Sequence, residues 1–371
     1  MTEAQRDSVL RLLYSPATGI GLNRIRIGLI EPGWQPAEGA PIVPDAPYPG
    51  PRGPATIDFI QEARAVNPAV RTGFQVGRFD SWITRSTWPL VVARYIKSSL
   101  DWARSRGHQA DWAGIHNEPS NGLPYFSGEQ LRDITIELGN LLKADGYSTR
   151  LSIPDDLNDG AGARKAAVIL ADPDARASVK ALSIHLYGSQ TPDQMRALAE
   201  QYDLPLWMTE YSDQVGGDEV GWASSIVHEM LVSYNCAAVD MLFGFMGSRA
   251  LGNPSAAYIT LNSTGTTYNG FSLNPSYYQM GHWSKYVPRG SVRIGAASTS
   301  QAVKVSAFNV AGRNVIVLVH AGNAAASFAI PAGNYRMIST QMSGTDRLSD
   351  KGLFRSAVTL LARSVTTLVE Q

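Results

Sequence analysis

Two glutamates, each closing a short apolar run, are the residues of this chain whose placement could do chemistry. Residues 111–120 read DWAGIHNEPS, so Glu118 ends the run and a proline follows it directly. Residues 206–212 read LWMTEYS, and Glu210 likewise ends an apolar run before polar residues. A single glutamate at a strand end is more often a solvated loop residue. Two of them at two strand ends predict a paired-carboxylate site. In such a site one carboxyl group donates a proton and the other acts as base or nucleophile.

Alternation along the expected strands predicts which polar side chains share the enclosed side of the sheet with the glutamates. In residues 181–187, ALSIHLY, every second residue is apolar, which leaves His185 and Tyr187 facing inward. The same alternation turns His116 inward. Each histidine taken alone is equally consistent with a core histidine bound to a backbone carbonyl. We expect His185 and Tyr187 to orient a substrate or to hold Glu210 ionised, because hydrogen bonds to a carboxylate favour its charged form.

Two arginines lie on an inward face as well. In residues 23–30, NRIRIGLI, Arg24 and Arg26 alternate with apolar residues. Buried charges are costly unless they are paired, so we expect these arginines to neutralise the glutamates. Arg24 lies one layer deeper and is expected to be structural, whereas Arg26 is expected at the site. Asp155 and Asp156 could reach the same site, but a role as turn or helix caps would also explain them.

Strands and helices alternate over most of the chain, which predicts a parallel sheet with helices outside it. Active sites in closed barrels of this kind form at the carboxyl ends of the strands. The alternating part of the sequence contains seven expected strands, and a long proline- and glycine-rich loop is expected at residues 31–54. We expect strands near residues 23–30, 70–76, 111–118, 149–154, 179–187, 205–211 and 237–245, and helices near 8–14, 56–66, 89–106, 128–145, 161–171, 191–202, 218–235 and 275–287.

From residue 288 onward the pattern changes to short β-rich runs separated by glycine, asparagine and serine. Such runs predict an antiparallel β domain. We therefore expect two domains, a catalytic barrel over residues 1–287 and a β-sandwich side domain over residues 288–371.

The composition excludes several classes of function. The chain has 371 residues and 44% apolar content, enough to bury a large core. Its 32 basic and 32 acidic residues give a formal charge of zero, so no electrostatic footprint for nucleic acid or an anionic membrane is present, and a neutral substrate is favoured. The sequence does not indicate an oligomeric state.

No cofactor or metal is expected. The only cysteine, Cys236, excludes an intrachain disulfide and a cysteine-rich metal site, and the six histidines are scattered. No metalloprotease, phosphate-loop, serine-nucleophile or dinucleotide motif is present. No apolar run approaches the about 20 residues that span a bilayer, and the first residues lack a signal peptide's apolar segment. We expect a secreted protein whose leader is absent from this chain, with a cytoplasmic location as the alternative.

Three segments resemble glycoside hydrolase family 30, within clan A of the retaining β-glycosidases. They are residues 19–28 (GIGLNRIRIG), 206–212 (LWMTEYS) and 277–294 (YYQMGHWSKYVPRGSVRI), and the resemblance covers nearly the whole chain. The Asn-Glu-Pro sequence after residue 116 is similar to the end of the fourth barrel strand in the clan. The resemblance implies a (β/α)8 barrel with a fused β-sandwich. It also implies that Glu118 is the acid/base and Glu210 the nucleophile.

The resemblance further implies that Asn117 binds the 2-hydroxyl of the sugar. Strict alternation would point Asn117 outward, and a bulge at the strand end would reconcile the two. Tyr211, next to the second glutamate, and Trp82 are expected to contact substrate. Trp82 is equally consistent with a half-buried core or surface aromatic.

The chain departs from the family at its start. It begins at the helix that would follow the family's first, glycine-rich barrel strand, so we expect a barrel that lacks this strand. A truncated form of a longer protein would explain this, and the alternative is that part of residues 31–54 fills the eighth place. The last expected strand carries Phe243 and Phe245 where many members have tryptophan, which weakens any transfer of substrate identity.

We expect a retaining glycosidase that cleaves β-glycosidic bonds in an oligo- or polysaccharide such as xylan or β-glucan. One alternative is a carbohydrate-binding protein that has lost turnover. Another is an exo-acting β-glycosidase on small glycosides, which differs in the shape of the cleft rather than in its chemistry.

Overall fold

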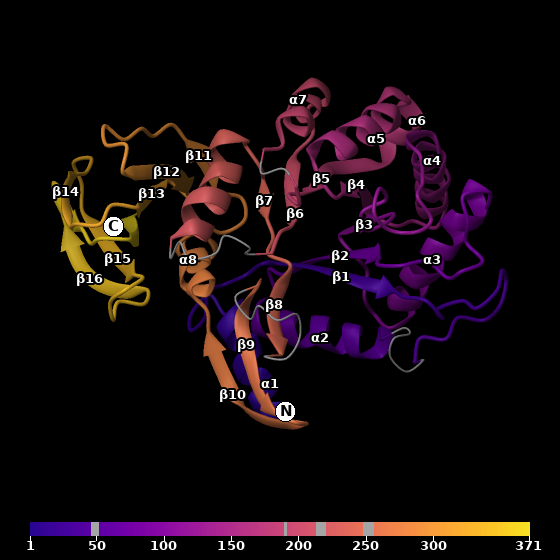
Figure 1. The fold of residues 1–371 in the computed structure, drawn as a ribbon, viewed down its shortest axis with the longest axis horizontal. Coiled ribbons are helices and arrows are strands. Elements are labelled where there is room, and N and C mark those ends of the chain that lie inside the picture. The colour runs from indigo at the N-terminus through magenta and orange to yellow at the C-terminus, as the bar shows by residue number, and fades with distance from the viewer. Residues whose placement is uncertain (46–51, 189–190, 213–219, 248–255) are drawn as a thin grey trace.

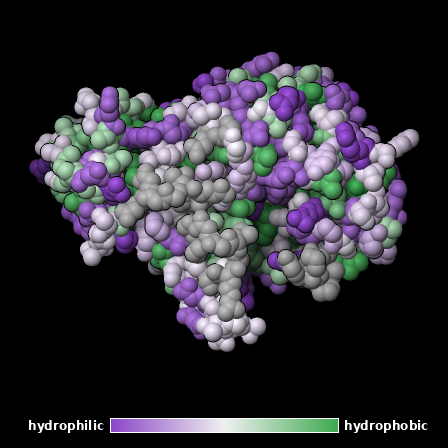
Figure 2. Space-filling view, in the orientation of Figure 1, coloured by the Kyte–Doolittle hydropathy of each residue, from purple (hydrophilic) through white to green (hydrophobic). Residues whose placement is uncertain are grey.

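A parallel sheet wrapped by helices forms the larger part of the molecule, and an antiparallel β domain lies beside it in the computed structural model (Figure 1). The structure describes residues 1–45, 52–188, 191–212, 220–247 and 256–371. Within these ranges no helix combines the length and apolarity needed to cross a bilayer. On the face drawn in Figure 2, hydrophobic residues are scattered among hydrophilic ones.

The parallel sheet orders its strands as the chain does, so each strand lies next to the one before it. Every neighbouring pair is parallel. The carboxyl ends of all its strands therefore meet at one edge. In the described residues the strands are β1 (Arg24–Ile30), β2 (Arg71–Val76), β3 (Trp112–Gly114), β4 (Arg150–Asp156), β5 (Val179–His185), β6 (Leu206–Glu210) and β7 (Ala238–Val239).

Helices connect these strands and cover the outer face of the sheet. Amphipathic sequences explain them, because apolar residues such as Ile134 and Leu138 of α4 recur at helical spacing and are buried. Helix α4 starts with a capping box in which Ser127 and Gln130 bond each other's backbone amides. The helices are α1 (Glu3–Tyr14), α2 (Gly53–Val66), α3 (Pro89–Ser105), α4 (Gly128–Ala144), α5 (Asp159–Ala171), α6 (Pro173–Ser178) and α7 (Asp193–Tyr202), followed by the π-helices η1 (Trp222–Val227) and η2 (Glu229–Ser233).

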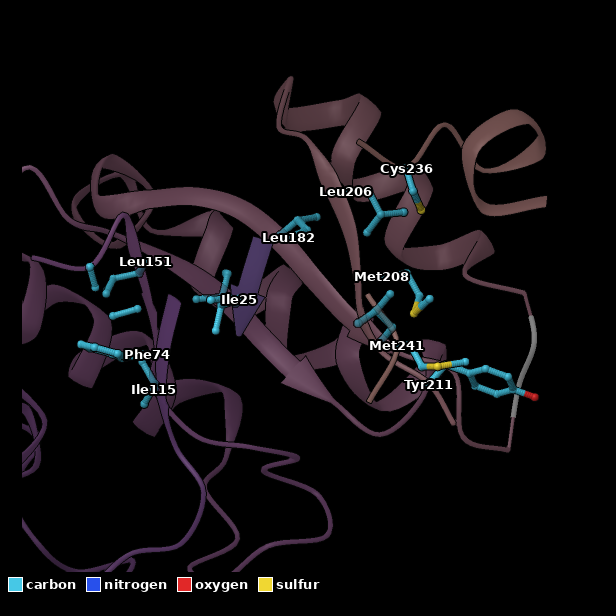
Figure 3. Packing of buried hydrophobic residues seen from close by; sticks show 14 of the residues in the cluster. Ile25, Phe74, Ile115, Leu151, Leu182, Leu206, Met208, Tyr211, Cys236 and Met241 are labelled. Carbon is cyan, nitrogen blue, oxygen red and sulfur yellow. The ribbon is translucent and has the colours of Figure 1, made fainter. Parts of the chain in front are cut away.

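The packing between strands and helices confirms the α/β class expected from the sequence. Figure 3 shows apolar side chains from different strands of the sheet, among them Ile25 on β1, Phe74 on β2 and Leu182 on β5. All three belong to one large buried cluster. The single expected helix over residues 218–235 is instead the pair of π-helices, within the part of that range that the structure describes.

The barrel is open between its first and last strands. Among the described residues β1 pairs only with β2, and β7 pairs only with β6. A cavity of about 1530 Å³ lies there, lined by residues of both edges. The described parts of residues 31–54 contribute no strand to the sheet, and residues 46–51 of this loop lie outside the described ranges. Over the residues that the structure describes, the sheet thus has seven strands, as expected from the sequence.

The expected strand over residues 237–245 is wrong in its second half. Strand β7 is only two residues long, and the chain then leaves the barrel as β8 (Phe243–Gly247). Strand β8 pairs with β9 (Ala257–Thr264), which forms a hairpin with β10 (Thr267–Leu273). The sequence pattern did not reveal this hairpin. Its local signal is Gly265, which takes a positive φ of 60° in the turn.

Helix α8 (Pro275–Ser284) joins the barrel to the antiparallel domain. His282 of α8 is buried, and its two ring nitrogens lie 2.8 Å from the hydroxyls of Thr367 and Thr340 in the β domain. Burial lowers the pKa of His282 to about 3, so the ring is neutral. These hydrogen bonds fix the helix to the β domain.

The β domain has its own core, which includes Val303, Leu318 and Leu368. Its antiparallel sheets confirm the expected class of this region, and we propose that the domain boundary lies between residues 287 and 288. The larger sheet contains, in order, β11 (Val292–Ile294), β12 (Val303–Val310), β13 (Arg313–His320), β18 (Ser364–Glu370), β15 (Tyr335–Gln341) and β16 (Ser349–Phe354), while β14 (Ala326–Ala329) pairs with β17 (Ala357–Leu360).

Candidate active site

Glu118 and Glu210 face each other at the carboxyl end of the sheet. Glu210 is the last residue of β6, whereas Glu118 lies beyond the end of β3 at Gly114. One carboxylate oxygen of each glutamate and one ring nitrogen of His185 all lie within 4.8 Å of one another. Both glutamates are largely buried, at 7% and 8% exposure. The structure therefore brings together the two carboxylates that the sequence pattern paired.

His185 lies between the two glutamates but bonds Glu118. It ends β5 and is fully buried. Its Nε2 lies 3.0 Å from Nη2 of Arg26, which can only donate, so Nε2 accepts and Nδ1 carries the proton. Nδ1 lies 2.9 Å from Oε1 of Glu118, whereas it is 3.8 Å from Oε1 of Glu210. His185 thus acts first on Glu118, and its expected contact with Glu210 is the longer one.

The surroundings of Glu118 favour its ionised form. Burial raises the pKa of the carboxyl group, but hydrogen bonds from His185 and Asn121 outweigh it, so the pKa is lowered. The side-chain amide of Asn121 donates to Oε2 over 2.8 Å. In the free protein Glu118 therefore gives up its proton more readily than an ordinary glutamic acid.

Glu210 is bound by a cation on one oxygen and by a phenol on the other. Nη1 of Arg26 lies 2.9 Å from Oε2, and the hydroxyl of Tyr187 donates to Oε1 over 3.2 Å. Burial raises the pKa of Tyr187, so the phenol stays a neutral donor. Arg26 and Tyr187 therefore lie where the sequence placed them.

Arg24 has a different partner. Its Nη2 lies 3.1 Å from Oδ2 of Asp240, just beyond β7, and its guanidinium lies 4.2 Å and 4.3 Å from the ring centres of Trp112 and Trp207. This ion pair with flanking aromatic rings connects the two open edges of the barrel. Arg24 therefore has a structural place, as expected, but it does not neutralise a glutamate.

Asn117 presents its amide to the same cluster. Its Oδ1 accepts from Nη2 of Arg26 over 2.9 Å and from Nε2 of Gln75 over 3.0 Å. These two bonds leave the side-chain NH₂ group of Asn117 available as a donor. The expected bulge is not required, because β3 ends at Gly114 and the alternation of a strand does not extend to residue 117.

The two aromatic candidates lie further from the cluster. The ring of Tyr211 is only 5% exposed and stacks between Tyr187 and Trp222, with ring centres 6.1 Å and 6.3 Å away. Trp82 is half-buried, and its indole N–H donates to the carbonyl of Gln35 over 2.6 Å. Contacts of Tyr211 and Trp82 with a substrate therefore stay predictions.

Three further residues remain to be placed, and sequence reasoning missed one of them, Glu31. His116 is a core histidine: it packs 5.0 Å from Phe79, and burial lowers its pKa to about 4. Glu31 lines the large cavity, and burial raises its pKa. Asp155, for which the sequence left open a place at the site or a role as a cap, is 1% exposed and lies beside Arg26.

The cluster of Glu118, His185 and Glu210 offers donor atoms that could hold a metal ion. However, the guanidinium of Arg26 lies 2.9 Å from Glu210 and 3.0 Å from His185. This fixed positive charge already compensates the carboxylates and would repel a cation. The arrangement is better suited to carboxylate chemistry than to metal binding.

A match over more than half of the sequence shows the family of this chain. The profile of glycosyl hydrolase family 59 matches residues 1–243. The chain belongs to this family. The match includes both glutamates and confirms the class of glycoside hydrolases that the paired carboxylates indicated.

Solved structures of family 30 and related enzymes have a similar fold. The chain is similar to the catalytic domain of a family 30 xylanase C from Talaromyces cellulolyticus, with 19% identity, a TM-score of 0.80, and coverage of 100% of this chain and 93% of that one. It is also similar to an endo-β1,6-glucanase, with 18% identity, a TM-score of 0.78, and coverage of 100% and 87%. At these identities the likeness concerns the fold alone.

Among curated proteins the chain is similar to the lysosomal acid glucosylceramidase of Mus musculus. The two are 26% identical over 264 residues, which is 64% of this chain and 50% of that protein. The chain is also similar to a putative glucosylceramidase from Caenorhabditis elegans. It spans half of the mouse protein's length and less than half of the length of the protein from C. elegans.

Proposed function

We propose that this chain is a retaining glycoside hydrolase with Glu210 as the nucleophile and Glu118 as the acid/base. The observation that carries the proposal is the approach of the two carboxylates, since one oxygen of Glu118 lies within 4.8 Å of one oxygen of Glu210. Retaining enzymes hold their carboxyl groups about 5–5.5 Å apart, whereas inverting enzymes need about 6.5–9.5 Å to admit a water molecule. The spacing favours direct attack by one carboxylate.

In the first step an oxygen of Glu210 attacks the anomeric carbon while the bond from that carbon to the leaving oxygen breaks. Glu118 gives its proton to the leaving oxygen, and Arg26 and Tyr187 hold the attacking carboxylate in place. The side-chain NH₂ of Asn117, with its carbonyl oxygen already bonded, is positioned to donate to a sugar hydroxyl.

In the second step Glu118 takes a proton from water, which attacks the anomeric carbon and releases Glu210. The lowered pKa of Glu118 suits this step, because the group must then be ionised. The same lowered pKa reduces the fraction of Glu118 that is protonated, and the first step needs the protonated form. The expected consequence is an enzyme that works best in acidic solution.

The substrate that we propose is a β-linked glycan such as xylan or a β-glucan. The support is the activity of two proteins of similar fold, a xylanase and an endo-β1,6-glucanase. A polysaccharide substrate favours a secreted location, and one protein of similar fold is described as an exported protein of Bacteroides fragilis.

One experiment tests the mechanism. The chain is incubated with xylan, β-1,6-glucan and aryl β-glycosides, and NMR follows the anomeric signal of the first product. A β-configured product is expected, with Glu210→Ala as the inactive control. A product that appears first in the α configuration would refute retention. Analysis of product length separates an endo-enzyme from an exo-acting one.

A second candidate function is sugar binding without turnover. The specific observation in its favour is the opening between β1 and β7, which leaves the cavity beside Glu210 without a wall of paired strand. Calorimetry would show sugar affinity, with no reducing ends released over long incubation, if this function is correct.

A further inference from the structure

Asp155 lies among the catalytic candidates without reaching the cavity. It is the penultimate residue of β4, is 1% exposed, and takes a positive φ of 56°. It does not cap the following helix, because Asn158 is the N-cap of α5. A buried carboxylate needs partners that compensate its desolvation. The partners of Asp155 show what it does.

The side chain of Asp155 contacts the strand of the nucleophile and the cation that binds it. Oδ1 accepts a hydrogen bond from the hydroxyl of Thr209 over 2.6 Å, and Thr209 directly precedes Glu210. Oδ2 lies 3.7 Å from Nε of Arg26. Nε of Arg26 has no hydrogen-bond partner among the described residues, so Asp155 is held to this edge of the guanidinium by charge.

The contact of Asp155 with Arg26 affects the whole guanidinium group because of the geometry of that group. The group is planar and rigid, so a charge that fixes its Nε edge also sets the direction of its two Nη atoms. Those atoms are the ones that bond Glu210, Asn117 and His185. Asp155 therefore influences three groups of the site through a single arginine.

The backbone of Asp155 acts on the other glutamate. Its carbonyl accepts a hydrogen bond from the amide of Glu118 over 2.8 Å. Glu118 also has a positive φ, of 52°, which is uncommon outside glycine. Two residues in such conformations persist only where the surroundings determine them. The bond between them holds the acid/base in this conformation.

The neighbouring strand leaves room for this carboxylate. A Cβ atom placed on Gly114 of β3 would lie 2.8 Å from Oδ2 of Asp155. Any side chain there would displace Asp155 or bend the strand. Glycine at this position is thus required by the close approach of the carboxylate.

We propose that Asp155 is a positioning residue that sets the placement of both catalytic carboxylates. Its side chain acts on Glu210 through Arg26 and Thr209, and its carbonyl acts on Glu118. This inference rests on the proposed roles of the two glutamates. Because Asp155 is buried, it acts without touching the substrate.

The test is the Asp155→Asn variant, which keeps the shape of the side chain and removes its charge. Misplacement of reacting groups should lower kcat by about 10- to 100-fold, with little change in KM. A negative charge disfavours ionisation of nearby acids, so its removal should move both limbs of the pH profile of kcat/KM to lower pH. A purely structural role would not move these limbs.

The matched control is Asp159→Asn. Asp159 is also a buried aspartate, at 5% exposure, and it accepts from the backbone amides of Gln194 and Met195, away from the glutamates. This variant should lower the melting temperature without moving the pH limbs. The positioning role is overturned if Asp155→Asn keeps both limbs and kcat, or behaves as Asp159→Asn does.

Two further variants keep the inference testable if Asp155→Asn does not fold. Thr209→Val removes the hydroxyl that bonds Asp155, and Thr209→Ser restores it. We expect a lower kcat for the valine variant and recovery for the serine variant, and equal activity of the two would overturn the inference. If Glu210→Ala and Glu118→Gln lose activity while the Asp155 and Thr209 variants do not, the positioning role fails and the proposed function stands. If Glu210→Ala keeps its activity, the proposed function itself fails.

Discussion

The Nδ1–H of His185 donates to Oε1 of Glu118 over 2.9 Å, on the carboxylate proposed to act as the acid. A histidine in this tautomer stabilises the ionised glutamate, because the bond is strongest to the charged form. Together with Asn121 it lowers the pKa of Glu118 in the free protein. The free site therefore favours the base form of Glu118, and lower pH favours the protonated form that the first step uses.

Removal of the hydrogen bond from Asn121 should change the pH dependence. Without this donor the ionised form of Glu118 is less stabilised, so the pKa of Glu118 rises toward its ordinary value. Glu118 then stays protonated to higher pH, and the basic limb of kcat/KM should move upward in Asn121→Ala. The control is Ser120→Ala on the same loop, because the hydroxyl of Ser120 bonds Asp156 rather than Glu118. A downward or absent shift in Asn121→Ala would contradict this account of the pKa.

Replacement of Glu210 by alanine should lower hydrolysis by several orders of magnitude, since no other group can form the covalent intermediate. Added azide should restore part of the activity by attack from the vacated side, and the product should be a glycosyl azide. Mass spectrometry of the product checks this. Near-normal turnover of the variant without azide would show that the nucleophile is another residue.

Replacement of Glu118 by glutamine should remove the proton donor and spare binding. General acid catalysis contributes about 10²–10⁴-fold, so substrates with poor leaving groups should lose that much in kcat. Aryl glycosides with activated leaving groups need little protonation and should lose far less in the first step. Steady-state rates on both kinds of substrate measure the difference, and equal losses would argue against an acid/base role.

A strand added to the open edge of the barrel should stabilise the protein. The edges of β1 and β7 expose backbone donors and acceptors that a closed barrel would pair. A glycine-rich strand fused ahead of residue 1 should therefore raise the melting temperature and reduce aggregation. A fusion of the same length with prolines cannot complete the pairing and serves as the control. Equal melting temperatures of the two fusions would show that the edges do not accept a strand.

Local patterns in the sequence were sufficient to predict the fold class and to single out the two glutamates of the site. Alternating strands and helices are set by periodicity along short segments, and this predicted the parallel sheet and the separate antiparallel domain. Glu118 and Glu210 stood out because each ends an apolar run, which is also a local property. The inward placement of Arg26 and His185 followed from simple alternation within regular strands, and Tyr187 follows two residues beyond the end of β5.

Only the tertiary structure decided which of these groups bond one another. Thr209 and Asp155 lie 54 positions apart in sequence, and their hydrogen bond depends on how two strands are placed in the sheet. The positive φ of Glu118 and Asp155 is likewise imposed by the bond between their backbones. The departure of β8 from the barrel depends on its pairing with β9, which a pattern within residues 237–245 does not contain. Periodicity within one segment carries no information about such partners, because hydrogen bonds between strands are determined by register and backbone conformation across the whole sheet.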